Sequence, residues 1–154
     1  MKPDYTRICQ RLRVLTENIP YETANLANAS ALLWQNLEDI NWAGFYQYRD
    51  GILVLGPFQG KPACVKIPMG KGVCGTAAEQ NAMQLVNNVH EFPGHIACDG
   101  ASNSEIVIPL HVKGALWGVL DIDSPLFSRF TPEDAAGLVQ FAQTMEEILE
   151  KCSR

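Results

Sequence analysis

Long apolar runs and leader-like segments are missing from this sequence of 154 residues. No apolar stretch approaches the roughly 18 residues that a membrane-spanning helix requires. The first residues, Met1 to Asp4, are followed by a mixed polar segment, whereas a secretory signal peptide would continue with an apolar core. We therefore expect a cytoplasmic protein that does not bind a membrane.

Clusters of basic residues are missing as well. The 12 lysines and arginines are outnumbered by 17 acidic residues, which gives a formal net charge of −5. Binding to the phosphate backbone needs a concentrated positive surface, so we do not expect nucleic acid as a partner. The length, the 47% hydrophobic content and the 19% charged content are typical of one globular domain, covering residues 1–154.

The cysteines lack the spacing of a disulfide framework or of a structural zinc site. There are five of them at uneven intervals: Cys9, Cys64, Cys74, Cys98 and Cys152. Structural zinc is usually held by close Cys-x-x-Cys pairs, and the sequence contains none, so we expect no bound metal. A looser zinc site from Cys64, Cys74, Cys98 and a histidine stays open at this point, beside core packing and redox chemistry.

Two short motifs resemble known binding sites but lack the required context. Residues 70–75 match G-x-G-x-x-G, yet no long βαβ unit follows, so we expect no nucleotide site. Residues 90–95 resemble the zinc motif H-E-x-x-H, but they contain one residue too many and a Pro-Gly pair that forbids the necessary helix. What remains is the thiol of Cys74 near the start of a short helix, where the helix dipole favours a thiolate.

Hydrophobic periodicity predicts the order of helices and strands. Helices are expected at 4–17, at 21–37, from Thr76 to about Asn81, and after the cap Thr131; strands are expected at 40–48, 52–56, 63–69, 83–86, 105–112 and 115–123. Cys9 and Cys152 fall on packing faces of the first and last helices. The pattern predicts an α+β fold, a central antiparallel sheet with the N- and C-terminal helices packed on it. The apolar stripes of those two helices fit either mutual packing or a dimer interface.

Three acidic residues, Glu105, Asp121 and Asp123, lie at the ends of the last predicted hairpin. A three-residue turn, 112–114, would place Glu105 opposite Asp121 and point all three acids to one face. A two-residue turn, 113–114, would send Glu105 to the other face, because side chains alternate along a strand. We expect the three-residue turn, since acids gathered without a neighbouring basic residue indicate a shared site.

Two other stretches are candidates for a site. Trp42, Gly44 and Tyr46 fall on one face of the first predicted strand. There they are either core residues or the apolar wall of a pocket in which the glycine leaves room for a ligand. Residues 87–104 form a predicted loop that contains Cys98, and loops of this length in a compact domain are usually functional or disordered.

Longer segments carry a resemblance to a known family. They are Asn-Trp-Ala-Gly-Phe-Tyr at 41–46, Gly-Pro-Phe-Gln-Gly at 56–60, Ala-Cys-Val-Lys-Ile at 63–67, Gly-Val-Cys-Gly at 72–75, the run from Asn88 to Cys98, Ser-x-Ser-Glu at 102–105 and Leu-Asp-Ile-Asp-Ser at 120–124. Together they resemble the free methionine-(R)-sulfoxide reductases, a family of GAF domains with a three-cysteine pattern. Most GAF domains are sensory modules without such thiols. The resemblance covers nearly the whole chain and implies a single GAF-like domain.

The resemblance also implies roles for particular residues. Cys98 would be the nucleophile, Cys64 the first choice to form the disulfide, and Cys74 an auxiliary thiol, with the order of the last two open. The positions that match the substrate pocket of the family are Trp42, Tyr46, Glu105, Asp121 and Asp123. The implied partners are free methionine-(R)-sulfoxide and thioredoxin. No cofactor would be bound, the thioredoxin and NADPH system would supply the electrons, and the assembly would be a homodimer.

The implied reaction is the reduction of free L-methionine-(R)-sulfoxide to methionine. A thiolate attacks the sulfoxide sulfur and becomes a sulfenic acid, and a second thiol then forms a disulfide that thioredoxin reopens. Clustered acids would pair the ammonium of a free amino acid, and one of them, its pKa raised by its neighbours, would donate a proton to the sulfoxide oxygen. The alternative is a non-catalytic GAF module that senses a small molecule or a redox signal.

Overall fold

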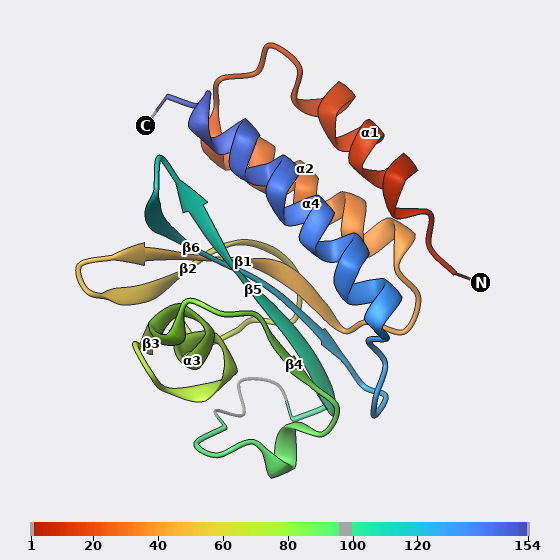
Figure 1. Ribbon diagram of the computed structural model, residues 1–154, viewed down its shortest axis with the longest axis vertical. Helices are drawn as coiled ribbons and strands as arrows, with labels where there is room; N and C mark the ends of the chain where they lie inside the picture. The colour runs from red at the N-terminus through yellow and green to blue at the C-terminus, as the bar shows by residue number, and fades with distance from the viewer. Residues whose placement is uncertain (1, 96–99, 154) are drawn as a thin grey trace.

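The computed structural model describes residues 2–95 and 100–153. The helices and strands of this part of the chain, coloured along the sequence in Figure 1, are in order α1 (Tyr5–Thr16), α2 (Glu22–Asn36), β1 (Trp42–Arg49), β2 (Ile52–Gly60), β3 (Lys66–Pro68), α3 (Gly72–Gln80), β4 (Gln84–Val86), the 3₁₀ helix η1 (Val89–Glu91), β5 (Ser104–Val112), β6 (Ala115–Ser124) and α4 (Pro132–Glu150). Their order is the one predicted from periodicity, and most lie near their predicted positions. The exceptions are α3, which starts earlier, β2, which runs to Gly60 rather than ending at residue 56, and β3, which is shorter than the predicted 63–69.

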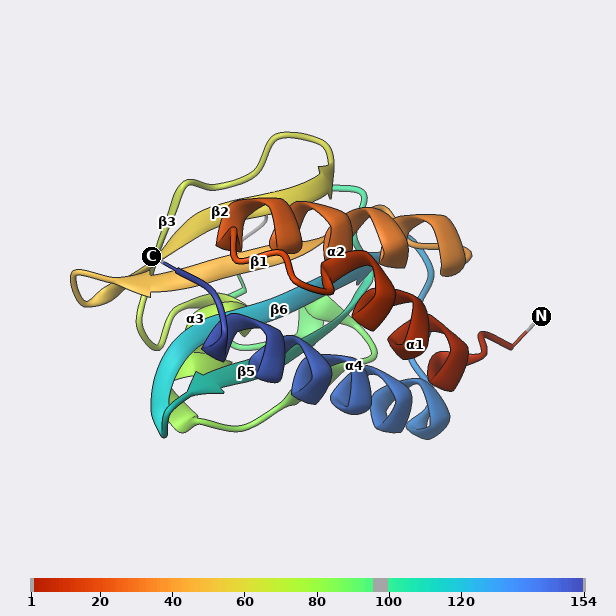
Figure 2. The same ribbon diagram turned by 90° about the horizontal axis from the view of Figure 1, so that it is seen from above.

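The strands form one antiparallel sheet in the order β3-β2-β1-β6-β5-β4. Helices α1, α2 and α4 cover one face of the sheet, and α3 lies against the other face (Figure 1 and Figure 2). This is the predicted α+β arrangement. Among the helices of the described residues, none combines the length and the apolar character needed to cross a membrane.

The first and last helices begin at residues that cap them. The Asp4 side chain accepts a hydrogen bond from Arg7 N at 3.1 Å, which satisfies a free amide of the first turn of α1. Thr131 and Asp134 form a reciprocal capping box at the start of α4. From the sequence, the apolar stripes of these two helices fitted either mutual packing or a dimer interface. The structure shows mutual packing, because α1 and α4 pack against each other within the chain.

Two apolar cores flank the sheet. The larger one lies between the sheet and the layer of α1, α2 and α4, and the second lies between the sheet and α3. Strand β1 shows how the sequence separates them, because its side chains alternate. Ala43 and Phe45 belong to the first core, whereas Trp42 and Tyr46 belong to the second. The predicted site residues of this strand therefore lie on the α3 side.

The turn between β5 and β6 differs from the prediction. Val112 pairs with Ala115, so the turn contains two residues, Lys113 and Gly114, rather than three. Their φ angles of 54° and 78° are both positive, as in the type I′ turns that match the twist of a hairpin. With this turn alone, the acids of the two strands would point to opposite faces.

A β-bulge farther along the hairpin restores the shared face. The register shifts by one residue between Leu110 and His111, where β6 carries one extra residue. Beyond the bulge Glu105 lies opposite Asp123, rather than opposite Asp121 as expected. All three acids line the same pocket. The prediction of a common face is therefore confirmed, although the predicted turn and pairing are wrong.

Helix α3 begins earlier than predicted, at Gly72 rather than at Thr76. Gly75 N donates a hydrogen bond to Lys71 O at 3.0 Å, which closes the first helical turn. Glycines disfavour a helix by their intrinsic propensity, but tertiary contacts outweigh that preference here. One such contact is the hydrogen bond from Gly72 N to Gly94 O at 3.2 Å, which ties the helix start to the following loop.

Candidate active site

A pocket lies between the sheet and the start of α3, on the side of the second core. Its lining includes six of the predicted site residues: Trp42, Tyr46, Cys74, Glu105, Asp121 and Asp123. Cys64 packs against the core that surrounds the pocket. Cys98, the predicted nucleophile, lies outside the described residues.

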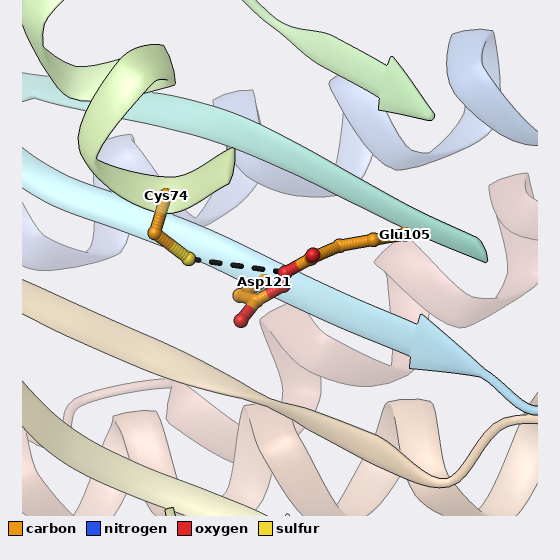
Figure 3. Close-up of side chains that lie close together, drawn as sticks. All are labelled: Cys74, Glu105 and Asp121. Carbon is orange, nitrogen blue, oxygen red and sulfur yellow. Dashed lines mark hydrogen bonds between the residues drawn. The ribbon is translucent and has the colours of Figure 1, made fainter. Parts of the chain in front are cut away.

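The three acids of the pocket come from the neighbouring strands β5 and β6. Glu105 and Asp121 are only 7% and 5% exposed, and Asp123 is half-buried. Figure 3 shows the carboxyl groups of Glu105 and Asp121 close together. Burial, followed by the charges of Asp121 and Asp123, raises the pKa of Glu105 well above its ordinary value. Glu105 is therefore suited to keep its proton and to donate a hydrogen bond.

Cys74 is the third residue of α3, and its thiol points toward the acids (Figure 3). Its Sγ lies 4.0 Å from Glu105 Oε2. Burial, followed by the charges of Asp121, Glu105 and Asp123, raises the pKa of the Cys74 thiol well above its ordinary value. The prediction that the helix dipole favours a thiolate here is therefore wrong. Desolvation and three nearby carboxyl groups outweigh the partial positive charge of the helix N-terminus.

Trp42 and Tyr46 form an apolar wall beside the acids. The ring of Trp42 stacks on Tyr46 and on Phe58, with centroid distances of 5.8 Å and 5.1 Å. Trp42 and Tyr46 are each 2% exposed, so they are core residues and pocket wall at once. The expected space above Gly44 is filled, because a Cβ at that position would lie 2.3 Å from the Cβ of Phe58.

Hydrogen bonds connect this wall to the segment that carries Cys64. Trp42 Nε1 donates to Lys61 O at 3.2 Å, and Tyr46 OH donates to Cys64 O at 2.9 Å. Burial, followed by the charge of Asp121, raises the pKa of the Tyr46 hydroxyl, so this group remains a donor. The aromatic wall therefore fixes the backbone at one of the cysteines to which the resemblance assigns a redox role.

The remaining cysteines differ in state and location. Cys64 is disulfide-bonded, whereas Cys9, Cys74 and Cys152 are free thiols. Cys9 is buried in the first core, as its position on α1 predicted. Cys152 follows the end of α4, and its Sγ accepts a hydrogen bond from Asn25 Nδ2 at 3.4 Å. Cys9 and Cys152 both lie away from the residues that line the pocket.

Sequence analysis does not single out three polar residues of the pocket wall, which are Lys71, His95 and Ser102. Ser102 Oγ accepts a hydrogen bond from Asn41 Nδ2 at 3.1 Å. Burial, followed by the charge of His90, lowers the pKa of His95. The motif segments that contain His95 and Ser102 could have indicated these two residues, whereas no pattern marks Lys71.

Three buried side chains of the pocket have the composition and spacing of a metal site. Cys74, Glu105 and Asp121 each offer one ligand atom, and these atoms lie within 4.8 Å of one another. This set differs from the looser zinc set considered from the sequence. Cys64 is disulfide-bonded and cannot supply a thiolate to that earlier set.

The fold and its pocket define the class of protein. The sequence profile of the GAF domain matches residues 10–149, a range that includes all the strands of the sheet described above. The similarity is much closer to one branch of that family. The free methionine-R-sulfoxide reductase of Escherichia coli (strain K12) is 63% identical over 126 residues, which are 82% of this chain and 76% of the relative.

Solved structures agree with this similarity. The fRMsr of Staphylococcus aureus in its reduced form has a TM-score of 0.93 and 47% identity, covering 96% of each chain. The complex of the same enzyme with its substrate has a TM-score of 0.92 and 46% identity, covering 97% of each chain. The chain therefore belongs to the free methionine-(R)-sulfoxide reductases of the GAF-domain family.

Proposed function

We propose that this protein reduces free L-methionine-(R)-sulfoxide to methionine. The observation that carries the proposal is the gathering of Glu105, Asp121 and Asp123 beside the aromatic wall of Trp42 and Tyr46. The similarity to named reductases and to a substrate complex agrees with it. Acids beside an apolar wall complement a substrate with a cationic end and a small S-methyl sulfoxide end.

The acids would recognise the free amino acid. A free amino acid carries an ammonium group, which Asp121 and Asp123 would pair, while Trp42 would contact the S-methyl group. Glu105, with its raised pKa, would donate a hydrogen bond to the sulfoxide oxygen. A methionine sulfoxide inside a peptide lacks the free ammonium, so the site would leave its acids unpaired and reject that substrate.

Cys98 would be the residue that reduces the substrate. Its thiolate would attack the sulfoxide sulfur, and the substrate oxygen would end on the cysteine as a sulfenic acid. The two electrons that the cysteine loses are gained by the substrate sulfur, and free methionine departs. The step uses one proton: Glu105 would deliver it to the departing oxygen and would regain the proton that the Cys98 thiol released on forming the thiolate.

Cys64 would resolve the sulfenic acid. Its thiol would attack the Cys98 sulfenic acid, a disulfide would form and water would leave. This pairing is supported by the disulfide-bonded state of Cys64, while Cys9, Cys74 and Cys152 are free. The raised pKa of Cys74 makes it a poor thiolate, so it would be the auxiliary resolving group. Thioredoxin would return two electrons and two protons to the disulfide, and NADPH would in turn reduce thioredoxin.

The assembly that we propose is a homodimer, on the resemblance alone. The apolar stripes of α1 and α4 face each other within the chain, so they do not supply the interface between two copies. Sedimentation velocity of the purified protein, at the protein concentrations used in the activity assays, would measure the mass of the assembly. A monomeric mass would contradict this part of the proposal and leave the chemistry untouched.

A coupled turnover assay tests the proposed activity. NADPH oxidation would be followed with thioredoxin and thioredoxin reductase, using the free R sulfoxide, the free S sulfoxide and a peptide-bound R sulfoxide. We expect turnover only with the free R sulfoxide. Binding of that compound without turnover, with a chemically reduced protein and with thioredoxin present, would favour the alternative of a non-catalytic sensor.

A further inference from the structure

We propose that Cys74, Glu105 and Asp121 form a binding site for a divalent transition-metal ion of the zinc class. The three residues come from α3, β5 and β6, their side chains lie close together (Figure 3), and all three line the pocket. The reaction proposed above uses no metal. Occupation of this site would therefore regulate the pocket rather than contribute to its chemistry.

The distances are close to those of a zinc site. Cys74 Sγ and Glu105 Oε2 are 4.0 Å apart, and all three ligand atoms lie within 4.8 Å of one another. Zinc bonds of about 2.3 Å to sulfur and about 2.1 Å to oxygen, at tetrahedral angles, place such ligand atoms about 3.6 Å apart. Each side chain would have to move inward by only a few tenths of an ångström to about half an ångström.

The hydrogen bonding of the acids leaves a ligand position open. Asp121 is 5% exposed, yet its Oδ1 has no hydrogen-bond partner within residues 2–95 and 100–153. A buried carboxylate oxygen without a partner is costly, and a cation supplies the missing interaction. The free space of the pocket is about 40 Å³, which would hold roughly the one or two water ligands that complete the coordination of an ion.

The donor set selects the class of ion. A thiolate is a soft ligand that favours zinc and cobalt over magnesium and calcium, and the two carboxylates suit the same ions. Three protein ligands with a fourth position toward the pocket give an open site that a solvent molecule can fill. All three ligands sit on helices or strands, so their relative positions are held by the fold.

Metal binding should exclude the substrate. The proposed function uses two of the same acids for the substrate, Asp121 for the ammonium and Glu105 for the sulfoxide oxygen, and this one consequence rests on that proposal. An ion coordinated by Glu105 and Asp121 would occupy both groups. We therefore expect Zn²⁺ to raise the apparent KM for free methionine-(R)-sulfoxide without an equal fall in kcat.

Cobalt absorption tests the site directly. The disulfide-bonded protein carrying Cys9→Ser and Cys152→Ser would be titrated with Co²⁺, so that Cys74 is the one free thiol among the described residues. We expect a thiolate-to-cobalt charge-transfer band in the near ultraviolet that saturates at one ion per chain and disappears when Zn²⁺ is added. In Cys74→Ser the band should vanish, and Glu105→Gln and Asp121→Asn should each weaken binding by about 10- to 100-fold or more.

The outcomes separate this site from the proposed enzymatic activity. His90→Ala is the matched control for adventitious binding to a surface histidine, and it should bind Co²⁺ as the parent does. No band, or a band that persists in Cys74→Ser, would overturn the site even if the protein reduces the sulfoxide. Unchanged affinity in both Glu105→Gln and Asp121→Asn would also overturn it. A band without any sulfoxide turnover would uphold the site and refute only the proposed activity.

Discussion

The two faces of one sheet perform different tasks with the same strands. Toward α1, α2 and α4, strands β5 and β6 present Ile106 and Ile122, which are 1% and 0% exposed and belong to the larger core. Toward α3 the next residues along the same strands are Glu105 and Asp121, which are almost as deeply buried. Burial of apolar side chains stabilises the fold, whereas burial of neighbouring carboxyl groups opposes it. The α3 face therefore keeps a buried oxygen, Asp121 Oδ1, that has no hydrogen-bond partner within the described residues and that a ligand or a proton can satisfy.

The largest expected effect comes from replacing, one at a time, the cysteines to which the proposed reaction gives a role. Cys98→Ser should form no methionine in a single turnover, because the attacking sulfur is gone. Cys64→Ser should release up to one equivalent and then stall as a sulfenic acid, unless Cys74 replaces it. Quenched assays that count methionine per protein, first without and then with thioredoxin, measure both effects.

Cysteines outside the pocket are the controls for that experiment. Cys9→Ser and Cys152→Ser should turn over normally, since Cys9 lies in the helix-side core and Cys152 follows the end of α4. A full equivalent of methionine from Cys98→Ser would move the nucleophile to another thiol. The raised pKa of Cys74 argues against that residue as the replacement.

A second prediction compares two adjacent residues of β6. Replacing one should lower the activity, and replacing the other should lower the stability. Asp121→Asn should lower kcat/KM for the free sulfoxide by about 100-fold or more, because it removes a charge that pairs the ammonium. The same change should leave the free energy of unfolding unchanged or raise it, since a buried carboxylate beside two others is removed. Ile122→Ala should do the opposite on the helix side, with a loss of about 2–5 kcal/mol in stability.

Urea unfolding and steady-state kinetics on the two variants give the comparison. Each variant serves as the control for the other, because the residues are neighbours in one strand and differ in the face that they occupy. Equal losses of stability in both variants would show that Asp121 is a structural residue. Full activity in Asp121→Asn would remove the acid from the substrate pocket.

Periodicity predicted most of this architecture because local spacing determines which side of a helix or strand is buried. The helix stripes that contain Cys9 and Leu138, and the alternation through Trp42 and Tyr46, needed no knowledge of the rest of the chain. The shared face of Glu105 and Asp121 was also predicted, but from a turn that does not exist. A three-residue turn and a bulge both add one residue to the hairpin, so the side-chain pattern could not distinguish them.

The properties that sequence reasoning missed depend on contacts between distant segments. The early start of α3 depends on Gly72 contacting Gly94, and helix propensity carries no information about that contact. The acidity of Cys74 depends on burial against Glu105 and Asp121, which are distant in the chain. A helix N-terminus lowers a thiol pKa only where the thiol is exposed to solvent or lies near positive charges. The Cys74 thiol meets neither condition.

A third prediction concerns the bulge that makes the shared face possible. At Gly118 a Cβ would lie 2.0 Å from Tyr46 O, so β1 and β6 approach each other there as only glycine permits. Gly118→Ala should cost about 1–3 kcal/mol and disturb the pocket, because the register of β6 would have to change. Gly51→Ala is the matched control: it lies in the β1–β2 turn at φ 81° with nothing within 4 Å of the added carbon.

Urea midpoints and sulfoxide turnover would be measured for both glycine variants. Gly51→Ala should lose about 1 kcal/mol from its positive φ and keep its activity. Gly118→Ala with normal stability and normal turnover would show that the bulge does not determine the face on which Glu105 lies.

The smallest expected effect concerns the pH dependence of stability, which should be opposite for the helix layer of α1, α2 and α4 and for the α3 face of the sheet. In the helix layer burial alone would raise the pKa of Asp134, but hydrogen bonds from Tyr5 and Thr131 and the charge of Arg129 lower it below 3.8. A lowered pKa contributes stability that is present above the unfolded value and is lost as the pH falls through the folded value. On the α3 face the raised pKa of Glu105 contributes stability that is present below 4.5 and is lost as the pH rises through the folded value.

In a plot of the free energy of unfolding against pH, the helix layer should therefore control the acid side and the α3 face the side at higher pH. Glu105→Gln should abolish the fall in stability that the wild type shows as the pH rises above 4.5, while leaving the acid side unchanged. Asp134→Asn should remove part of the acid-side loss below pH 3.8 and leave the other side intact, with Tyr5→Phe as a milder change in the same network. Urea unfolding at a series of pH values measures both slopes. If Glu105→Gln kept the wild-type slope above pH 4.5, the raised pKa of Glu105 would not be the source of that slope.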